Sequence, residues 1–140
     1  MNIGNILATK GGKVITVHPE QSLKEAIGML TQHNIGALVV VDDKGKPVGI
    51  LSERDLVHVA SRLGEVMFKQ KVSDCMTKNV VMATPHDDVH AVLKTMTDKR
   101  FRHMPIMDEG HLAGLVSIGD VVKAQLDDYR GTIDTLQSQL

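Results

Sequence analysis

Gly-Ile-Leu-Ser-Glu-Arg-Asp at residues 49–55 returns as Gly-Leu-Val-Ser-Ile-Gly-Asp at residues 114–120. The segment that opens each copy is also repeated: Val-Ile-Thr-Val-His-Pro at residues 14–19 matches Val-Val-Met-Ala-Thr-Pro at residues 80–85. Between these points the register is kept, apart from one residue deleted in a turn. The chain is therefore an internal duplication. Two copies are too few for a solenoid, so we expect two units packed with pseudo-twofold symmetry and a cleft between them.

Length and charge limit the class of protein. With 140 residues the chain has the size of one compact domain, and half of it, about 60 residues, would be marginally stable alone. A net charge of −1 provides no basic surface for a phosphate backbone. The only aromatic residues are Phe68, Phe101 and Tyr129, too few to stack a series of bases. We therefore do not expect a nucleic-acid partner.

Neither membrane insertion nor export is indicated by the sequence. The longest purely apolar run, residues 37–41, is far shorter than the roughly 20 residues that span a bilayer. The polar residues at the start of the chain lack a signal-peptide pattern. The single cysteine, Cys75, cannot form an intramolecular disulfide, in agreement with a reducing compartment. These features predict a cytoplasmic protein.

Apolar spacing predicts the order strand, helix, strand, strand, helix (β-α-β-β-α) in each copy, and hence a mixed α/β (α+β) fold. Residues 23–30 and 89–96 carry apolar side chains at i, i+3, i+4 and i+7, which gives each helix one buried stripe. Apolar runs at residues 38–41 and 104–107 are each followed by a turn and a second apolar run, the pattern of a hairpin. Each copy should therefore contribute a small sheet.

The duplication also sets the expected domain boundaries. We assign residues 1–60 to the first repeat, 61–71 to an exposed connector, 72–125 to the second repeat and 126–140 to a C-terminal helical tail. Short lead-in segments before the two copies resemble each other, with Leu7 and Met76 in equivalent places.

The tail carries an apolar seam. Its members step by 4, 3, 4, 3 and 4 positions through Val122, Leu126, Tyr129, Ile133, Leu136 and Leu140. This heptad spacing predicts an amphipathic helix, about 30 Å long if it is continuous, with one side to cover. Gly131, Thr132 and Thr135 lower its helix propensity. Two interpretations are open: the seam packs on the protein's own body, or it pairs with another subunit.

Ser-x-x-Asp marks the predicted start of the second helix in each copy, with Ser52 and Asp55 in the first and Ser117 and Asp120 in the second. One interpretation is structural, because a hydroxyl at the N-cap and an acidic residue three positions later form a capping box. The other is a nucleotide site. Free N–H groups at a helix N-terminus bind phosphate, and a nearby carboxylate can accept both hydroxyls of a ribose.

The second copy differs from the first at the entry to its middle strand. Where the first has Asn-Ile-Gly-Ala at residues 34–37, the second has Arg-Phe-Arg-His at residues 100–103. The basic residues indicate either a solvated strand edge or a cluster that neutralises phosphate, since arginine offers a two-pronged donor. Gly36 and Ala37 are small and would let a flat ring approach the backbone.

No catalytic or metal site is expected. His86 and His90 have the i, i+4 spacing of a zinc-binding helix, but no third ligand is indicated, and the helix expected directly after Pro85 would place them on an exposed first turn. No residue in sequence marks a base for a Cys75 nucleophile. Paired carboxylates of an acid-base site are not evident either.

Together these residues resemble a tandem pair of CBS (cystathionine β-synthase) domains, also called a Bateman module. The resemblance rests on the strand-proline-helix opening, on Ile-Gly-Ala-Leu-Val-Val-Val-Asp at residues 35–42, on His-Met-Pro-Ile-Met-Asp at residues 103–108 and on the paired Gly-x-x-Ser-x-x-Asp segments. It covers about residues 1–125, and its double occurrence makes it specific.

The resemblance implies a receptor for adenosine nucleotides, held in the cleft between the repeats. Asp55 and Asp120 would then hold ribose hydroxyls, with Ser52 and Ser117 as their hydroxyl partners near phosphate. The implied walls and phosphate contacts are Thr16, Gly36, Ala37, Arg54, Met82, Arg102, His103, Met104 and Pro105. Because Gly119 stands where the first copy has Arg54, the two sites should be unequal, with the stronger phosphate charge coming from Arg102 and His103.

The implied ligand is AMP or NAD(H), with ATP and S-adenosylmethionine as further candidates, and the implied assembly is a homodimer or a higher homo-oligomer. The leading hypothesis is a non-enzymatic sensor of cellular energy state in signal transduction, which reports the bound nucleotide to a protein target. The alternative is a dimerising scaffold in which the nucleotide is a fixed structural element and the partner binds the tail.

Overall fold

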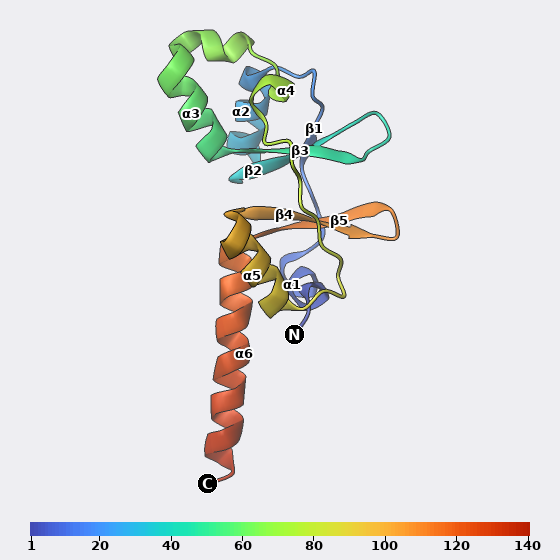
Figure 1. Ribbon diagram of the computed structural model, residues 1–140, viewed down its shortest axis with the longest axis vertical. Helices are drawn as coiled ribbons and strands as arrows, with labels where there is room; N and C mark the ends of the chain where they lie inside the picture. The colour runs from blue at the N-terminus through green and yellow to red at the C-terminus, as the bar shows by residue number, and fades with distance from the viewer. The chain divides into compact units, whose positions relative to one another are not determined.

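The computed structural model describes residues 1–140 and contains two compact units (Figure 1). We call residues 13–81 with 110–112 the repeat-1 unit, and residues 1–12, 82–109 and 113–140 the repeat-2 unit. The lead-in segment at the start of the chain thus belongs to the repeat-2 unit. Each unit is described by itself.

The repeat-1 unit is built around a three-stranded sheet. Its elements are β1 (Thr16–Val17), α2 (Leu23–His33), β2 (Ala37–Val41), β3 (Pro47–Ser52), α3 (Glu53–Leu63), the 3-10 helix η1 (Gly64–Lys69) and the one-turn helix α4 (Val72–Cys75). The strand order is β1-β2-β3, with β1 parallel and β3 antiparallel to β2. Residue Ala37 of β2 pairs with Ser52 of β3, so the central strand starts where α3 begins.

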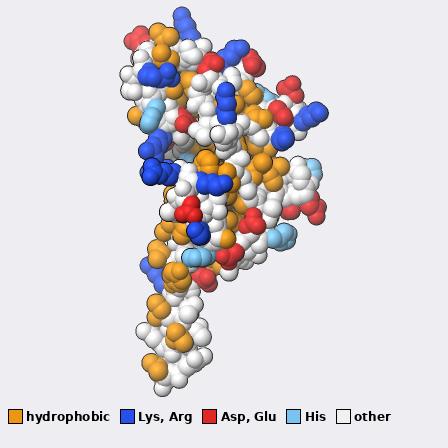
Figure 2. All heavy atoms as spheres, viewed as in Figure 1, with side chains coloured by type: hydrophobic (Ala, Val, Ile, Leu, Met, Phe, Trp, Pro, Cys, Tyr) orange, Lys and Arg blue, Asp and Glu red, His pale blue; other side chains and the backbone are white.

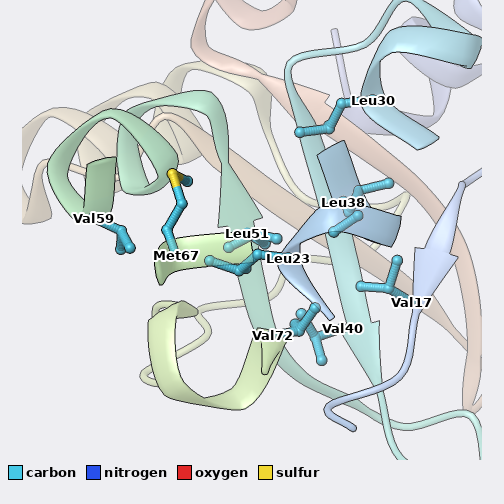
Figure 3. Packing of buried hydrophobic residues seen from close by; sticks show 10 residues of the cluster. Val17, Leu23, Leu30, Leu38, Val40, Leu51, Val59, Met67 and Val72 are labelled. Carbon is cyan, nitrogen blue, oxygen red and sulfur yellow. The ribbon is translucent and has the colours of Figure 1, made fainter. Parts of the chain in front are cut away.

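Aliphatic side chains from the sheet and the surrounding helices form the core of the repeat-1 unit (Figure 3). The predicted stripe of α2 is confirmed, since Leu23, Ala26 and Leu30 are buried. The predicted connector is mostly exposed, but Met67 in η1 is buried in this core. Its burial ties η1 to the unit, whereas we expected an exposed linker throughout.

The repeat-2 unit has the same plan with a smaller sheet. Its elements are α1 (Ile3–Lys10), α5 (Val89–Lys99), β4 (His103–Asp108), most of β5 (His111–Ser117) and α6 (Ile118–Ser138). The buried residues Val89, Val92 and Met96 confirm the predicted stripe of α5. The mixed α/β architecture with two repeats and a C-terminal helix is therefore as predicted.

The first strand predicted for the second copy is wrong as a strand. It is reduced to a single parallel bridge between Ala83 and Ile106. In the first copy the N–H of Val39 donates to the carbonyl of Ile15, and the equivalent of Val39 is Pro105, which has no N–H to donate. Only the bonds from Ala83 N–H to Pro105 and from Met107 N–H to Ala83 remain.

The first helix of the second copy begins later than we predicted, and the first helix of the first copy begins at the equivalent place. Ser22 and Asp88 are the N-caps, and each side chain accepts a hydrogen bond from a backbone N–H three residues on. A turn therefore separates Pro85 from α5, and His86 lies before the helix. The prediction that His86 and His90 share one helical turn is wrong. Asp88 is the N-cap of α5, so the helix begins at Val89 and includes His90 but not His86.

Helix α6 is continuous over 21 residues despite Gly131. Only Val121 and Ala124 of this helix are buried, so the interpretation in which the apolar seam packs on the protein's own body is wrong. Figure 2 shows hydrophobic side chains left uncovered along the C-terminal stretch of the chain. No helix in the structure combines the length and the apolar character required to cross a bilayer.

Candidate functional site

Ser52 and Asp55 form a capping box at the start of α3. Asp55 N–H donates to Ser52 Oγ at 3.3 Å, and Ser52 N–H donates to Asp55 Oδ2 at 2.9 Å. The Ser52 hydroxyl also donates to Oδ2, at 3.1 Å. The second oxygen, Oδ1, accepts a bond of 3.3 Å from the Thr77 hydroxyl. The structural interpretation of this motif is therefore correct, and it engages mainly one carboxylate oxygen.

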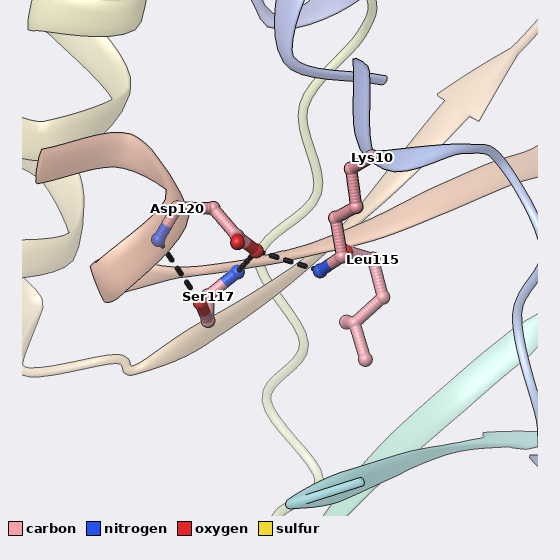
Figure 4. A network of polar contacts seen from close by, with 4 residues as sticks. All are labelled: Lys10, Leu115, Ser117 and Asp120. Carbon is pink, nitrogen blue, oxygen red and sulfur yellow. Dashed lines mark hydrogen bonds and ion pairs between the residues drawn. The ribbon is translucent and has the colours of Figure 1, made fainter. Parts of the chain in front are cut away.

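Ser117 and Asp120 repeat this box at the start of α6. Ser117 N–H donates to Asp120 Oδ2 at 2.8 Å, and Asp120 N–H donates to Ser117 Oγ at 3.1 Å. The partner outside the box differs, because Lys10 Nζ lies 2.6 Å from Asp120 Oδ2 and also donates to the Leu115 carbonyl at 2.8 Å (Figure 4). A cation thus touches one motif carboxylate and a neutral hydroxyl touches the other.

Lys10 sets the acidity of Asp120. Partial burial alone would raise the pKa of this carboxyl, but the hydrogen bond from Lys10, the N–H of Ser117, the Lys10 charge and the Ser117 hydroxyl together outweigh burial and lower the pKa below its ordinary value. The carboxylate is therefore ionised throughout the neutral range, ready to accept hydrogen bonds from a ligand.

One backbone hydrogen bond in each unit ties the entry of the middle strand to the helix start. Glu53 N–H donates to the Gly36 carbonyl at 3.0 Å, and Ile118 N–H donates to the Arg102 carbonyl at 2.8 Å. These bonds bring Gly36 beside the cap of α3 and Arg102 beside the cap of α6. Within its own unit, each predicted ribose-binding motif therefore lies next to the entry of the middle strand, where the first copy has the predicted wall residue Gly36 and the second has the predicted phosphate-binding residue Arg102.

The basic cluster is smaller than the sequence indicated. Arg100 adopts the left-handed conformation at φ 60° and ends α5 as its C-cap, as Asn34 does for α2 at φ 51°. Arg102 is exposed at the bend before β4, and His103 opens that strand, partly buried. We expected these basic residues to enter the strand, but neither arginine does: Arg100 is the C-cap of α5, Arg102 lies in the bend that follows, and only His103 is in β4.

The predicted wall residues lie at different depths. Thr16 is partly buried in β1, paired with Val39 of the central strand, and Met82 is 41% exposed. Ala37, Met104 and Pro105 are buried. Arg54 is exposed on the first turn of α3. Ten of the thirteen predicted positions lie in strands or at helix starts, and the other three, Gly36, Met82 and Arg102, lie in the segments that precede strands or bridges.

A close packing contact explains the motif glycines. A β-carbon added at Gly49 would lie 2.5 Å from Met76 Sδ, and one added at Gly114 would lie 2.5 Å from Leu7 Cδ2. Leu7 and Met76 thus occupy equivalent places in the two units, as the resemblance of their lead-in segments predicted. The lead-in helices need these glycines in order to reach the sheets.

Two residues beside the motif carboxylates escaped sequence reasoning, namely Lys10 and Thr77. Both belong to the lead-in segments, Lys10 at the end of α1 and Thr77 just after α4. The resemblance between these segments was the available signal. It does not identify the contacts, because Lys10 and Thr77 are not equivalent positions in the repeat: Thr77 directly follows Met76, whereas Lys10 is three residues beyond Leu7.

Each motif aspartate borders a surface groove within its own unit. In the repeat-2 unit a groove of about 400 Å³ includes Lys10, Asp120 and Lys123 in its lining. In the repeat-1 unit a groove of about 280 Å³ includes Arg54 and Asp55. Both carboxylates are therefore accessible from solvent on one side.

Cys75 lines the groove of the repeat-1 unit. Burial is the main cause that raises the pKa of its thiol, and the negative charge of Asp74 adds to it. A raised pKa disfavours the thiolate, which is the reactive form of a cysteine.

The sequence matches the CBS domain family at residues 3–62 and again at residues 72–127. A mitochondrial CBS domain-containing protein of Arabidopsis thaliana is 32% identical over 146 residues, which cover 99% of this chain and 71% of that protein. The crystal structure of a CBS-domain containing protein from Agrobacterium tumefaciens is 45% identical, with a TM-score of 0.84 and coverage of 89% of this chain and 99% of that one.

A third relative was solved with ligands. The CBS domain pair of protein MJ0100, in complex with 5′-methylthioadenosine and S-adenosyl-L-methionine, is 28% identical with a TM-score of 0.78, and the match covers 91% of this chain and 98% of that one. The two family matches fall on the two copies of the repeat, and the fold agrees with these structures. The chain belongs to the CBS domain family and contains two CBS domains.

Proposed function

We propose that this protein is a regulatory module that binds an adenosine-containing ligand at the Ser-x-x-Asp end of its repeats. One observation carries the proposal: in each unit a helix N-terminus, a cap hydroxyl and an ionisable carboxylate are joined to the entry of the middle strand by equivalent hydrogen bonds. Such an arrangement offers N–H groups to a phosphate and a carboxylate to a ribose diol. The related CBS domain pair solved with 5′-methylthioadenosine and S-adenosyl-L-methionine supports this ligand class.

Helix capping and ribose binding are compatible at these carboxylates. Both boxes use Oδ2 of the aspartate. Oδ1 of Asp55 meets only the long bond from Thr77, whose hydroxyl can rotate away, and Oδ1 of Asp120 accepts no hydrogen bond from the protein. A carboxylate can accept hydrogen bonds at both oxygens. A diol can therefore bind without breaking either cap.

Each unit supplies its own share of the proposed site. For the repeat-1 unit we propose Thr16, Gly36, Ala37, Ser52, Arg54 and Asp55. For the repeat-2 unit we propose Met82, Arg102, His103, Met104, Pro105, Ser117 and Asp120. The small residues at the entry of β2 admit a ring, whereas the cationic entry of β4 favours phosphate. Lys10 adds a second cation near Asp120.

The cationic residues lead us to propose a phosphorylated ligand, AMP or NAD(H) first and ATP next. S-adenosylmethionine, which has no phosphate, is a further candidate within the adenosine class. We also propose that the protein acts by binding and not by catalysis, with a ligand-dependent change in affinity for a protein target. Such a response requires that the ligand bind the two states of the module with different affinities.

Native mass spectrometry of freshly purified protein, followed by denaturation and mass analysis of the released small molecules, tests the proposal directly. Titration calorimetry with AMP, ATP, NADH, S-adenosylmethionine and 5′-methylthioadenosine follows. The matched control is 2′,3′-dideoxy-AMP, which lacks the diol but leaves both helix caps intact. We expect it to bind at least tenfold more weakly than AMP. Absence of binding by every adenosine compound at millimolar concentration would overturn the proposal.

A second candidate function is a dimerising scaffold, and the exposed seam of α6 favours it. In this case the ligand would be a fixed structural element. Exhaustive removal of the ligand by mild denaturation and refolding, followed by light scattering, separates the two. A scaffold with a structural ligand would change its mass or lose its fold, whereas a sensor would return to a folded protein that binds the ligand reversibly.

A further inference from the structure

Helix α6 presents an apolar strip to solvent from Val122 to Leu136, and Leu140, just beyond the end of the helix, continues its spacing. Its members, 41% exposed at Val122 and more exposed at every later position, are Val122, Leu126, Tyr129, Ile133, Leu136 and Leu140. Their alternating spacing of four and three residues places them on one side of a helix. Figure 2 shows that hydrophobic side chains remain uncovered on this stretch.

The helix needs a partner on this side. The part of α6 after Gln125, residues 126–138, is short enough to be marginal in water by itself, and Gly131 within it costs about 1 kcal/mol relative to alanine. The two buried residues of α6, Val121 and Ala124, lie near its start. The protein's own body therefore stabilises the first turns of α6 and leaves the later ones without apolar cover.

We propose that α6 pairs in parallel with α6 of a second copy of this chain, as a short two-stranded coiled coil. The seam has the a and d pattern, with Leu126, Ile133 and Leu140 at a, and Val122, Tyr129 and Leu136 at d. Five such side chains on each α6, with Leu140 just beyond its end, give the pair roughly 1,000 Å² of surface to bury, about what a stable interface requires. The inference is independent of the nucleotide.

The residues that flank the seam select the parallel orientation. The e positions hold Lys123, Arg130 and Gln137, and the g positions hold Gln125, Thr132 and Gln139. In a parallel pair each e position faces a g position of the partner, so Arg130 meets Gln125 without repulsion. In an antiparallel pair centred on the seam, the two copies of Arg130 would face each other. Like charges in contact disfavour that arrangement.

The charges of the tail argue against a lipid surface as the occupant. Asp127, Asp128 and Asp134 outnumber Arg130, the one basic residue after position 125. Helices that lie on anionic membranes carry lysine and arginine on their polar face. A second copy of the chain supplies an apolar face without this penalty.

Sedimentation equilibrium on the full chain, without added nucleotide, tests the pairing. The seam variant Leu136→Glu and its control Ser138→Glu introduce the same charge two residues apart, on the seam and on the outer side of α6. We expect a dimeric parent protein and a dissociation constant about a hundredfold higher for Leu136→Glu, because each dimer loses two buried leucines. The control should dimerise like the parent. Both residues are exposed, and circular dichroism checks that both variants fold.

Disulfide cross-linking tests the orientation and is informative even where another surface also holds two copies together. In a Cys75→Ser background, we expect Leu136→Cys to form a cross-linked dimer under mild oxidation and Ser138→Cys to remain monomeric on a denaturing gel. An antiparallel pair would separate the two Leu136 positions by about ten residues of helix, or 15 Å. A monomeric parent, equal masses for the two glutamate variants, or cross-linking that fails or does not discriminate would each overturn the proposal.

Discussion

The side chain of Leu7 occupies the space into which a β-carbon at Gly114 would project, at 2.5 Å from its Cδ2 atom. Met76 stands in the same relation to Gly49, where the carbonyl oxygen of Thr77 also lies 3.1 Å from the added carbon. The first glycine of each motif therefore serves packing of a lead-in helix, while the serine and the aspartate serve the helix start.

We expect Gly114→Ala to lower the free energy of unfolding by about 1 kcal/mol and Gly49→Ala by about 2–3 kcal/mol. The leucine tip in the repeat-2 unit can move aside, whereas the backbone carbonyl of Thr77 cannot. Urea denaturation at neutral pH measures both values. Leu7→Ala should cancel most of the additional cost of Gly114→Ala in a double-mutant cycle.

Gly28→Ala is the matched control, because it lies inside α2 with no atom within 4 Å of an added β-carbon. This substitution should stabilise the protein by about 0.5–1 kcal/mol, since alanine favours the helix. Equal destabilisation at all three glycines would contradict the packing explanation.

Lys10→Met should make the stability of the protein less dependent on acid pH. The Lys10–Asp120 pair is partly exposed, so its loss should cost only about 0.5 kcal/mol at pH 7. The native pKa of Asp120 is depressed, so this contribution is present above the ordinary aspartate pKa and disappears as the pH falls through the lower native value. The parent and the variant should therefore converge at low pH in urea denaturation measured from pH 7 to pH 2. For the control Lys123→Met, in the same groove, the free energy of unfolding should differ from that of the parent by a constant amount from pH 7 to pH 2.

Arg102→Gln should separate phosphorylated from unphosphorylated ligands if the proposed site is correct. Loss of a charge-assisted hydrogen bond should weaken AMP about tenfold and leave 5′-methylthioadenosine, which has no phosphate, unchanged. Arg100→Gln, at the helix cap just before it, should change neither affinity. Calorimetry with both ligands measures this, and equal weakening of the two would place Arg102 outside the phosphate site.

Removal of the residues after Gln125 should leave the folded body intact. The last buried residue of α6 is Ala124. The free energy of unfolding of a single chain, after the contribution from association between chains is subtracted, should therefore change by no more than about 0.5 kcal/mol. Thermal denaturation over a range of concentrations measures it. A body that unfolds after the truncation would show that the tail supports the core.

Much of the fold was predictable because its signals are local. The stripes of α2 and α5 follow from apolar spacing, and the hairpins follow from apolar runs around a turn. The failed predictions have local causes as well. Pro105 lacks the backbone N–H that would pair with a neighbouring strand. The N-cap of α5 is Asp88, so the helix begins after Asp88 and not directly after Pro85.

The chemistry of the motif was only half predictable. Ser52 with Asp55, and Ser117 with Asp120, are three residues apart, and their capping boxes follow from that spacing alone. The partner outside each box does not, because Lys10 is 110 residues from Asp120 and Thr77 is 22 residues from Asp55. Neither of these separations along the sequence corresponds to the repeat of a helix or a strand.

The amino-acid sequence by itself determined the duplication, the type of most helices and strands within the two copies and the position of the two caps, since hydrogen bonds and apolar periods between near neighbours suffice for these. Only the tertiary structure decided that α1 belongs with the repeat-2 unit, that a cation touches Asp120 but not Asp55, and that the seam of α6 stays uncovered. These features depend on which distant segments pack together, and packing is set by the complementarity of whole surfaces, which no local pattern records.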